Sequence, residues 1–245
     1  MSFFFDAVEN NEYDKVDVFL SSMEHKHFLL RYNSKGRTAL HIACKRGYLL
    51  MCYILIERGA YVNQQDTNIG WTPLIYACNA QEIEICKLLK NRNVNIDGCD
   101  KYGSTALHYA AHHDFDDICE WLIKNKANVD KTNDNGDTAL ILASRNGNVE
   151  ICKLLLDGGA NVNKPDSGGV TALMIALHFR NIDVCKLLLG TSGINIDIRN
   201  KNGHRAIDIA IARGLTEITN IIIGRGAVQL ESKQRGGETL VTCTW

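Results

Sequence analysis

One short segment recurs along this chain at a nearly constant spacing, and that period constrains the fold more than any other feature. The segment is TALH at residues 38–41, and its equivalents begin at Thr72, Thr105, Thr138, Thr171 and Arg205. A glycine stands two residues before each of these positions. A period of 33 or 34 residues is typical of one supersecondary unit repeated in tandem. The chain is therefore predicted to be a stack of similar units.

Each unit is predicted to contain two short helices. In the unit whose anchor is Thr138, the pattern places Ala139, Leu140 and Ala143 on one face of the first helix. Cys152 and Leu155 lie on one face of the second. Neither helix can bury its apolar stripe alone, so neighbouring units must stack to form a continuous core.

The residues that carry the period resemble a known family. G-x-T-A-L-H-x-A, the 33-residue spacing and G-A-x-V-N after the second helix are similar to the ankyrin repeat over about residues 1–227. The resemblance implies an all-α solenoid of helix-turn-helix units with short β-hairpin fingers, the first and last units serving as caps. The expected units are residues 1–32, 33–65, 66–99, 100–132, 133–165, 166–199 and 200–227. Residues 228–245 form a tail, expected to be flexible, folded back as a cap, or a docking peptide.

The stretch TALHYAAHHDFDDIC, residues 105–119, raises the possibility of a metal or catalytic site. Its His108 and Cys119 fall in slots that recur in other units, which predicts structural roles for both. The stretch lacks the Glu of the H-E-x-x-H motif, and no C-x-x-C pair occurs in the chain. Catalytic and phosphate-binding motifs are also missing. We therefore expect no metal, no cofactor and no enzyme activity.

Composition excludes several broad classes. The net charge of −1 and the lack of a nucleic-acid-binding motif argue against nucleic acid, and no apolar run is long enough to span a bilayer. Nine cysteines without a targeting segment favour free thiols in a reducing compartment. The sequence thus predicts a cytoplasmic protein, with the nucleus as the alternative.

Other positions change from unit to unit while the scaffold positions do not, as expected of a surface free of packing constraints. In the ankyrin family, such positions at the ends of first helices and on fingers line a concave groove that contacts partners. The predicted partner-binding residues are Arg37, Lys45, Arg46, Trp71, Tyr102, His112, His113, Asp137, Arg145, His178, Phe179 and His204. For Trp71, two roles remain open: packing on the next finger, or anchoring a partner side chain.

Basic residues gather near the N-terminal end of this surface. Lys35, Arg37, Lys45 and Arg46 have no acidic residue close to them in the sequence. The cluster is expected either to attract an acidic segment of a partner or to be an ordinary solvated face.

The resemblance implies a monomeric, non-enzymatic interaction module that binds a folded protein or a peptide. One form is a scaffold or adaptor. The alternative is an inhibitor or assembly chaperone, since GWTPL at residues 70–74 is similar to a segment found in such a member of the family.

Overall fold

The computed structural model describes residues 2–226, and the chain divides between Asn128 and Val129 into two compact units. Unit 1 ends at Asn128 and unit 2 begins at Val129. The predicted tail, residues 228–245, lies outside the described residues.

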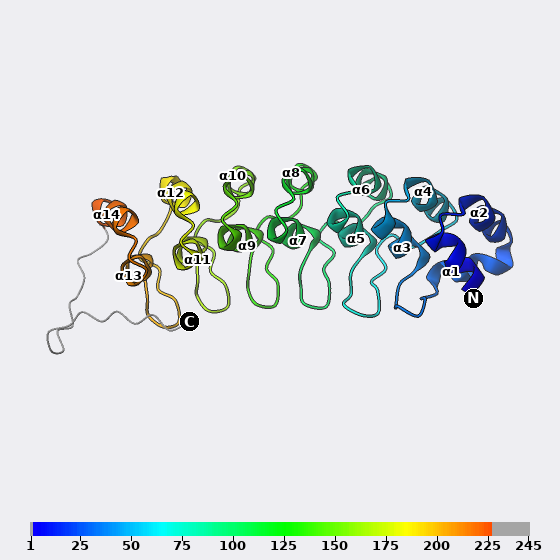
Figure 1. The fold of residues 1–245 in the computed structure, drawn as a ribbon, viewed down its shortest axis with the longest axis horizontal. Coiled ribbons are helices and arrows are strands. Elements are labelled where there is room, and N and C mark those ends of the chain that lie inside the picture. Colours follow the sequence, from blue (N-terminus) through cyan, green and yellow to red (C-terminus); the bar gives the residue numbers. More distant parts are fainter. Residues whose placement is uncertain (1, 227–245) are drawn as a thin grey trace. The chain divides into compact units, whose positions relative to one another are not determined.

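Unit 1 contains four helix pairs and one additional 3₁₀ segment. Its elements are α1 (Ser2–Glu9), α2 (Tyr13–Ser21), η1 (Met23–Leu30), α3 (Ala39–Arg46), α4 (Leu49–Glu57), α5 (Pro73–Asn79), α6 (Ile83–Lys90), α7 (Ala106–His112) and α8 (Asp116–Lys124). The first helices of the pairs form one row and the second helices another, while the fingers project on the side of the first helices (Figure 1).

Unit 2 repeats the same arrangement with three pairs. Its helices are α9 (Ala139–Asn146), α10 (Val149–Asp157), α11 (Ala172–Phe179), α12 (Ile182–Gly190), α13 (Ala206–Ala212) and α14 (Thr216–Gly224). The all-α repeat fold predicted from the period is confirmed, with helices beginning directly after the predicted anchors. Thr38, Thr72 and Thr138, for example, each occupy the N-cap of a first helix.

The first helices are buried on nearly all sides, beyond the one apolar face that the sequence pattern indicated for them. In α9, every residue from Ala139 to Ser144 is buried. The reason is visible at α5, which packs against α3, α6 and α7 at once. A helix with neighbours on three sides cannot keep a polar face. The second helices do keep one: Cys152 of α10 is buried, whereas Lys153 is exposed.

The fingers lack the strand ladders that a β-hairpin would have. Within residues 2–226 the structure contains one isolated bridge, between Cys99 and Thr105, and no strand. A finger is instead closed by two backbone bonds, such as those from the Asn133 amide to the Asp137 carbonyl at 3.1 Å and from the Gly136 amide to the Asn133 carbonyl at 2.9 Å. The side chain that begins the finger supplies further bonds: Asn133 Oδ1 accepts from the amides of Asn135 and Asp137, both at 3.0 Å. The loops are too short for more ladder bonds, so an Asx turn closes them.

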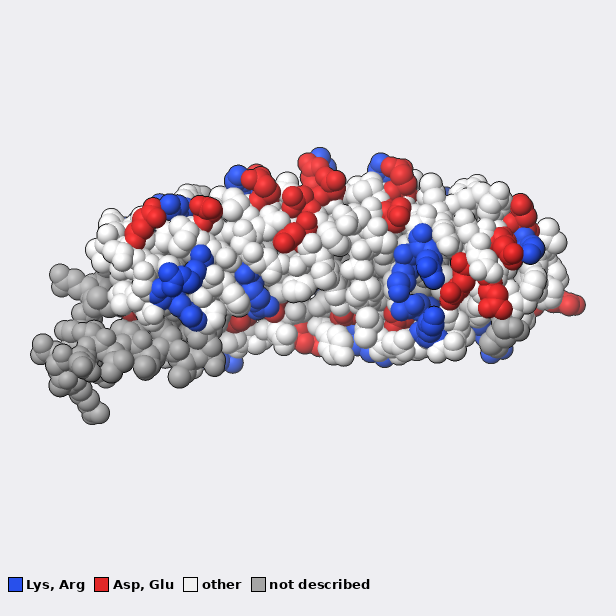
Figure 2. All heavy atoms as spheres, viewed as in Figure 1, with Lys and Arg blue, Asp and Glu red and all other residues white. Residues whose placement is uncertain are grey.

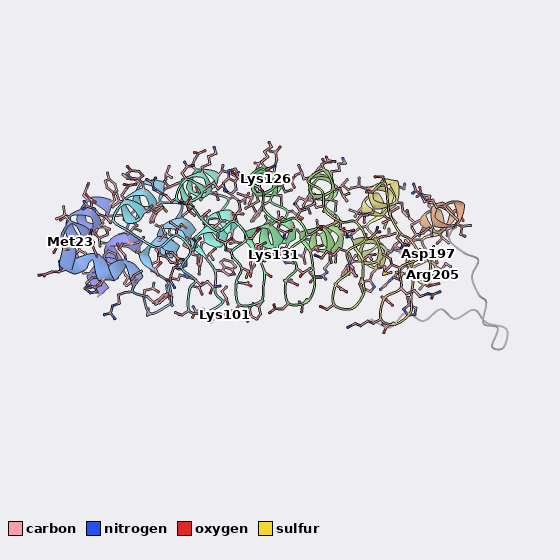
Figure 3. The ribbon with its side chains drawn as sticks, turned by 180° about the vertical axis from the view of Figure 1, so that it is seen from behind. Met23, Lys101, Lys126, Lys131, Asp197 and Arg205 are labelled. Carbon is pink, nitrogen blue, oxygen red and sulfur yellow. The ribbon has the colours of Figure 1, made fainter. Side chains whose placement is uncertain are left out.

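The first helix pair, α1 and α2, lies within residues 1–32, the unit expected to serve as a cap. Asn11 adopts a left-handed φ of 58°, as Gly47 does in the next pair at 73°. The following segment, η1, was not predicted, because its sequence has no helical apolar period. It is joined to α2 by a stack between Phe19 and His25, whose ring centroids lie 4.1 Å apart. Met23 marks this end of unit 1 in Figure 3.

Cysteines fill the recurrent slot on the second helices as predicted. Cys52, Cys86, Cys119, Cys152 and Cys185 are all fully buried and all free. Burial raises the pKa of the Cys119 thiol far above its ordinary value, so this side chain behaves as a small apolar residue.

No helix among residues 2–226 is long and apolar enough to cross a membrane.

Candidate functional site

The histidine of the TALH segment is part of the scaffold. His41 Nδ1 accepts a bond from the Thr38 amide at 3.1 Å, and its Nε2 then donates to the Gln64 carbonyl at 2.8 Å. The second bond ties α3 to the connection that follows its helix pair, as predicted for this slot. Burial lowers the pKa of His41 to about 4, so the ring is neutral at pH 7. His108 makes the same capping contact with Thr105.

The predicted partner-binding residues differ in how much of them reaches solvent. Lys45, Arg46, Tyr102, His112, His113 and Phe179 are exposed; Arg37, Trp71, Arg145, His178 and His204 are partly buried; Asp137 is buried. Exposed members come from both units.

Unit 1 contains a polar network that links successive repeats, and it includes Trp71. The Trp71 indole N–H donates to the Tyr109 hydroxyl at 2.9 Å, and that hydroxyl donates to Asp100 Oδ2 at 2.6 Å. The indole also packs edge-on against Tyr76 and Tyr109, at centroid distances of 5.1 and 4.8 Å. Of the two roles left open for Trp71, the structure shows the packing role, with the contacts made to first helices rather than to a finger.

Arg37 makes the equivalent contact one repeat earlier. Its Nε donates to the Tyr76 hydroxyl at 2.8 Å, and this hydroxyl donates to Asp66 Oδ2, also at 2.8 Å. The other oxygen of Asp66 accepts from three finger amides, those of residues 68, 69 and 70. Burial opposes the charge of Asp66, but the bonds from Tyr76 and these amides hold the pKa of its carboxyl below the ordinary value. Burial and the bond to Asp66 raise the pKa of Tyr76 to about 12.

Basic side chains gather around α3 and the finger that precedes it (Figure 2). The pKa of Lys45 is lowered, first by the charge of Arg37, then by burial and by the charges of Arg46 and Lys35. The four residues therefore do form one cluster. The expectation that no acid lies near it was wrong: Arg46 lies 3.7 Å from Glu9, which the preceding helix pair brings alongside.

The exposed histidines lie beside the unit 1 network. The ring of His113 is stacked on Tyr109 and on Phe115, with centroid distances of 6.5 and 5.6 Å. Burial and the neighbouring His112 lower the pKa of His113. Within the described residues, no group of three or more His, Cys, Asp or Glu side chains is placed to hold a metal ion. Lys101 lies further out, at the tip of the finger (Figure 3), and Tyr102 follows it in the chain and is exposed.

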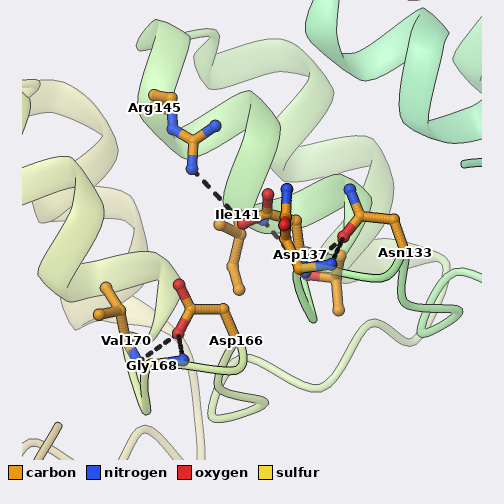
Figure 4. Close-up of polar contacts among 9 residues, drawn as sticks. Asn133, Asp137, Ile141, Arg145, Asp166, Gly168 and Val170 are labelled. Carbon is orange, nitrogen blue, oxygen red and sulfur yellow. Dashed lines mark hydrogen bonds and ion pairs between the residues drawn. The ribbon is translucent and has the colours of Figure 1, made fainter. Parts of the chain in front are cut away.

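In unit 2, three of the predicted positions make side-chain contacts. Arg145 on α9 lies 3.4 Å from the buried carboxylate of Asp137, at the base of the finger (Figure 4). The guanidinium of Arg213 contacts the ring of His178. Phe179, next to His178, remains exposed.

The sequence-based reasoning missed Tyr76 and Tyr109. Both stand four residues after a TALH-type anchor, and the same slot holds an aliphatic residue in the other four helix pairs that have an anchor. That break in the repeat pattern was the available signal.

Comparison with protein families agrees with this geometry. Residues 35–67 match the model of a single ankyrin repeat, and residues 63–133 and 116–200 match a model of three ankyrin repeats. Together these matches cover more than half of the chain. The protein belongs to the ankyrin repeat family.

Curated relatives match over short segments. The chain is 36% identical over 76 residues to protein phosphatase 1 regulatory subunit 12A of Mus musculus, covering 31% of this chain and 7% of that protein. It is 36% identical over 73 residues to ankyrin repeat and SAM domain-containing protein 6 of Rattus norvegicus, covering 30% and 8%. B-cell lymphoma 3 protein homolog of Mus musculus is 33% identical over 73 residues, covering 30% and 16%. The matched segments thus span only a small part of each relative.

Proposed function

We propose that this protein is a non-enzymatic interaction module whose partner is another protein. The binding surface is formed by the fingers and by the C-terminal ends of the first helices, and we call it the recognition surface. Its role is that of a scaffold or adaptor that brings a partner to a second protein.

One observation carries the proposal: several of the positions that vary between repeats, Tyr102 and Phe179 among them, reach solvent on the fingers and first helices. The recurrent positions of the same elements, such as Thr105 and Leu107, are buried. Among the variable positions, Tyr102 and Phe179 expose 61% and 49% of their surface. Large aromatic side chains are enriched among the residues that dominate interface energies.

Rigidity is the physical advantage of such a surface. No buried side-chain nitrogen or oxygen atom of the described residues lacks a hydrogen-bond partner. A scaffold with its interior polar groups paired holds the recognition surface in one conformation, and little entropy is then lost on binding.

The names of two relatives favour a regulatory role, since one is a regulatory subunit and another contains a SAM domain beside its ankyrin repeats. The alternative function is an inhibitor or assembly chaperone that masks a partner's working surface. An adaptor binds two proteins at once, whereas an inhibitor abolishes its partner's activity at an equimolar ratio. We also propose that the protein is monomeric and lies in the cytoplasm or nucleus, which the free thiols favour.

The proposal is tested by affinity capture with single alanine variants of the full chain. Tyr102→Ala in unit 1 and Phe179→Ala in unit 2 should each reduce the amount of captured partner, because an anchoring aromatic commonly contributes about 2 kcal/mol or more. The matched control is Tyr53→Ala, since Tyr53 is 47% exposed but lies on the second helix α4.

Capture is quantified by mass spectrometry, and thermal unfolding of each variant is recorded alongside. Loss of capture by Tyr53→Ala, with Tyr102→Ala and Phe179→Ala behaving as wild type, would place the binding surface on the second helices instead.

A further inference from the structure

Four basic residues of unit 1 form a cluster whose charge is not balanced. We define the α3 basic cluster as Lys35 on the finger, Arg37 at its end, and Lys45 and Arg46 in the last turn of α3. Lys35, Lys45 and Arg46 are exposed, and Arg37 is partly buried. Figure 2 shows a group of Lys and Arg side chains over α3 and the finger that precedes it.

Three carboxylates lie near the cluster, those of Glu9, Asp66 and Glu82, and none neutralises it. The Glu82 carboxylate lies against Gly47, directly after Arg46, but forms no ion pair with a member of the cluster. Glu9 pairs with Arg46 at 3.7 Å, but both side chains are substantially exposed, and such pairs are weak. Asp66 is buried and uses both oxygens for bonds to Tyr76 and to finger amides. Among residues 2–226, no carboxylate lies within ion-pair distance of Lys35, Arg37 or Lys45. Positive charge is therefore in excess at this surface.

Arg37 is the most ordered member of the cluster. Its Nε is fixed by the Tyr76 hydroxyl, and its guanidinium carbon lies 5.3 Å from the centroid of the Tyr76 ring. Tyr76 is in turn fixed by Asp66. Because Nε is occupied, the two terminal nitrogens of the guanidinium remain for a ligand. A planar pair of donors matches the two oxygens of a carboxylate.

We propose that the α3 basic cluster binds an acidic peptide segment of the partner protein, with Arg37 as the carboxylate-recognising residue and Tyr76 as the residue that positions it. This inference rests on the proposed function and names the chemistry of the partner at one part of the recognition surface.

The aromatic residues beside the cluster favour a peptide over a single-stranded nucleic acid. A nucleic acid of that kind is commonly held by bases that stack on open aromatic faces. Here Tyr76 is buried, with 4% of its surface exposed, and Trp71 is packed edge-on between Tyr76 and Tyr109. The cluster offers charge without a stacking platform.

The test measures binding of fluorescein-labelled oligoglutamate to the full-length protein by fluorescence anisotropy at low ionic strength. Wild type should bind, and binding should weaken as salt rises toward about 0.15 M, where the Debye length is about 8 Å. The variant Lys45→Gln with Arg46→Gln should bind about tenfold more weakly, because it removes half of the cluster's charge.

The matched control is Lys87→Gln with Lys90→Gln. These lysines also lie in the last turn of a unit 1 helix, α6, and are also exposed, so position, exposure and charge change are the same. This control should bind oligoglutamate as wild type does. Equal weakening by the two double variants would overturn the assignment to the α3 basic cluster.

A third variant distinguishes the effect of the hydrogen-bonding geometry of Arg37 from the effect of its positive charge. Arg37→Lys keeps the charge but loses the bond to Tyr76 and the paired donors, so we expect binding several-fold weaker than wild type. Lys45→Arg should bind as wild type. An unaltered affinity of Arg37→Lys would contradict the role given to Arg37 and Tyr76.

Two further results test the assignment of an acidic peptide to the α3 basic cluster. Oligouridylate of the same net charge should bind more weakly than oligoglutamate, and tighter binding of the RNA would overturn the peptide assignment. If wild type binds no oligoglutamate, the inference fails, whereas the proposed function stands or falls separately on the Tyr102→Ala and Phe179→Ala captures.

Discussion

His41 illustrates how one side chain in this fold connects local capping with the packing of repeats. Its two ring nitrogens bond the N-cap of its own helix and the Gln64 carbonyl of the connection beyond. Both contacts require one neutral tautomer, with the proton on Nε2. Burial is what keeps the ring neutral.

The neutral state of His41 predicts a dependence of stability on pH. Its pKa is about 4 in the folded protein against an ordinary 6.5, so the unfolded chain takes up the proton first as pH falls. The stabilisation that neutral His41 gives the folded protein is fully present above pH 6.5 and is lost as pH falls through 4. At pH 5 the free energy of unfolding should be lower by about 2 kcal/mol on this account.

The measurement is urea unfolding at pH 7 and at pH 5 for wild type and His41→Gln. Glutamine at this position can still cap the helix but does not titrate. Wild type should lose more stability than the variant over this interval. Equal losses in the two proteins would show that His41 is not the titrating group.

At the scale of elements, the fingers are held by one side chain that recurs in a fixed slot. Asn133, Asp166 and Asn200 each bond the amides two and four residues further on. Asp66 and Asp100 occupy the same slot, but their second oxygen also accepts a bond from a tyrosine. The carboxylate is therefore needed only where a tyrosine follows on the first helix.

This difference predicts unequal effects of the same substitution in two fingers. Asp100→Asn should destabilise the protein by about 1–3 kcal/mol, because the amide cannot replace the charged acceptor of the Tyr109 hydroxyl. Asp166→Asn should be close to neutral, since asparagine already fills this slot in neighbouring fingers and the Asp166 bonds go to the amides of Gly168 and Val170 (Figure 4). Thermal unfolding of both variants checks this, and similar shifts in the two would contradict the role given to the tyrosine bond.

The repeat pattern predicted the elements well and the contacts between them poorly. Helix pairs, N-caps such as Thr38 and buried slots such as Cys119 follow from residues that recur in register. The Trp71–Tyr109 bond and the Arg46–Glu9 pair join residues 38 and 37 positions apart in the sequence, and their partners do not recur. Such contacts depend on how two repeats are stacked, which a pattern within one repeat does not encode. The segment η1 was missed for a related reason: it is held by the aromatic cluster around Phe19 rather than by a period of its own.

The candidate surface was predictable to a similar degree. Variable positions were identified from the register, and exposed Tyr102 and Phe179 are among them. That Asp137 is buried and paired with Arg145 was not predictable, because burial at the base of a finger depends on the helix packed behind it.

At the scale of the whole molecule, the net charge is close to zero, but the charged side chains are unevenly distributed over the surface. The chain carries a net charge of −1, yet its unit 1 holds the α3 basic cluster, while lysines on the second helices are often paired, as Lys87 is with Glu84 and Lys153 with Glu150. Recognition must then depend on which surface a partner meets, and the central claim is that this surface lies on the fingers and first helices.

Site-specific photo-crosslinking tests that claim most directly. A benzophenone amino acid is placed at Tyr102, on a finger, or at Tyr53, on the second helix α4, and the full-length protein is irradiated in the cells that produce it. The account predicts a discrete protein adduct from position 102 and none from position 53. The same adduct from position 53, with none from position 102, would contradict it.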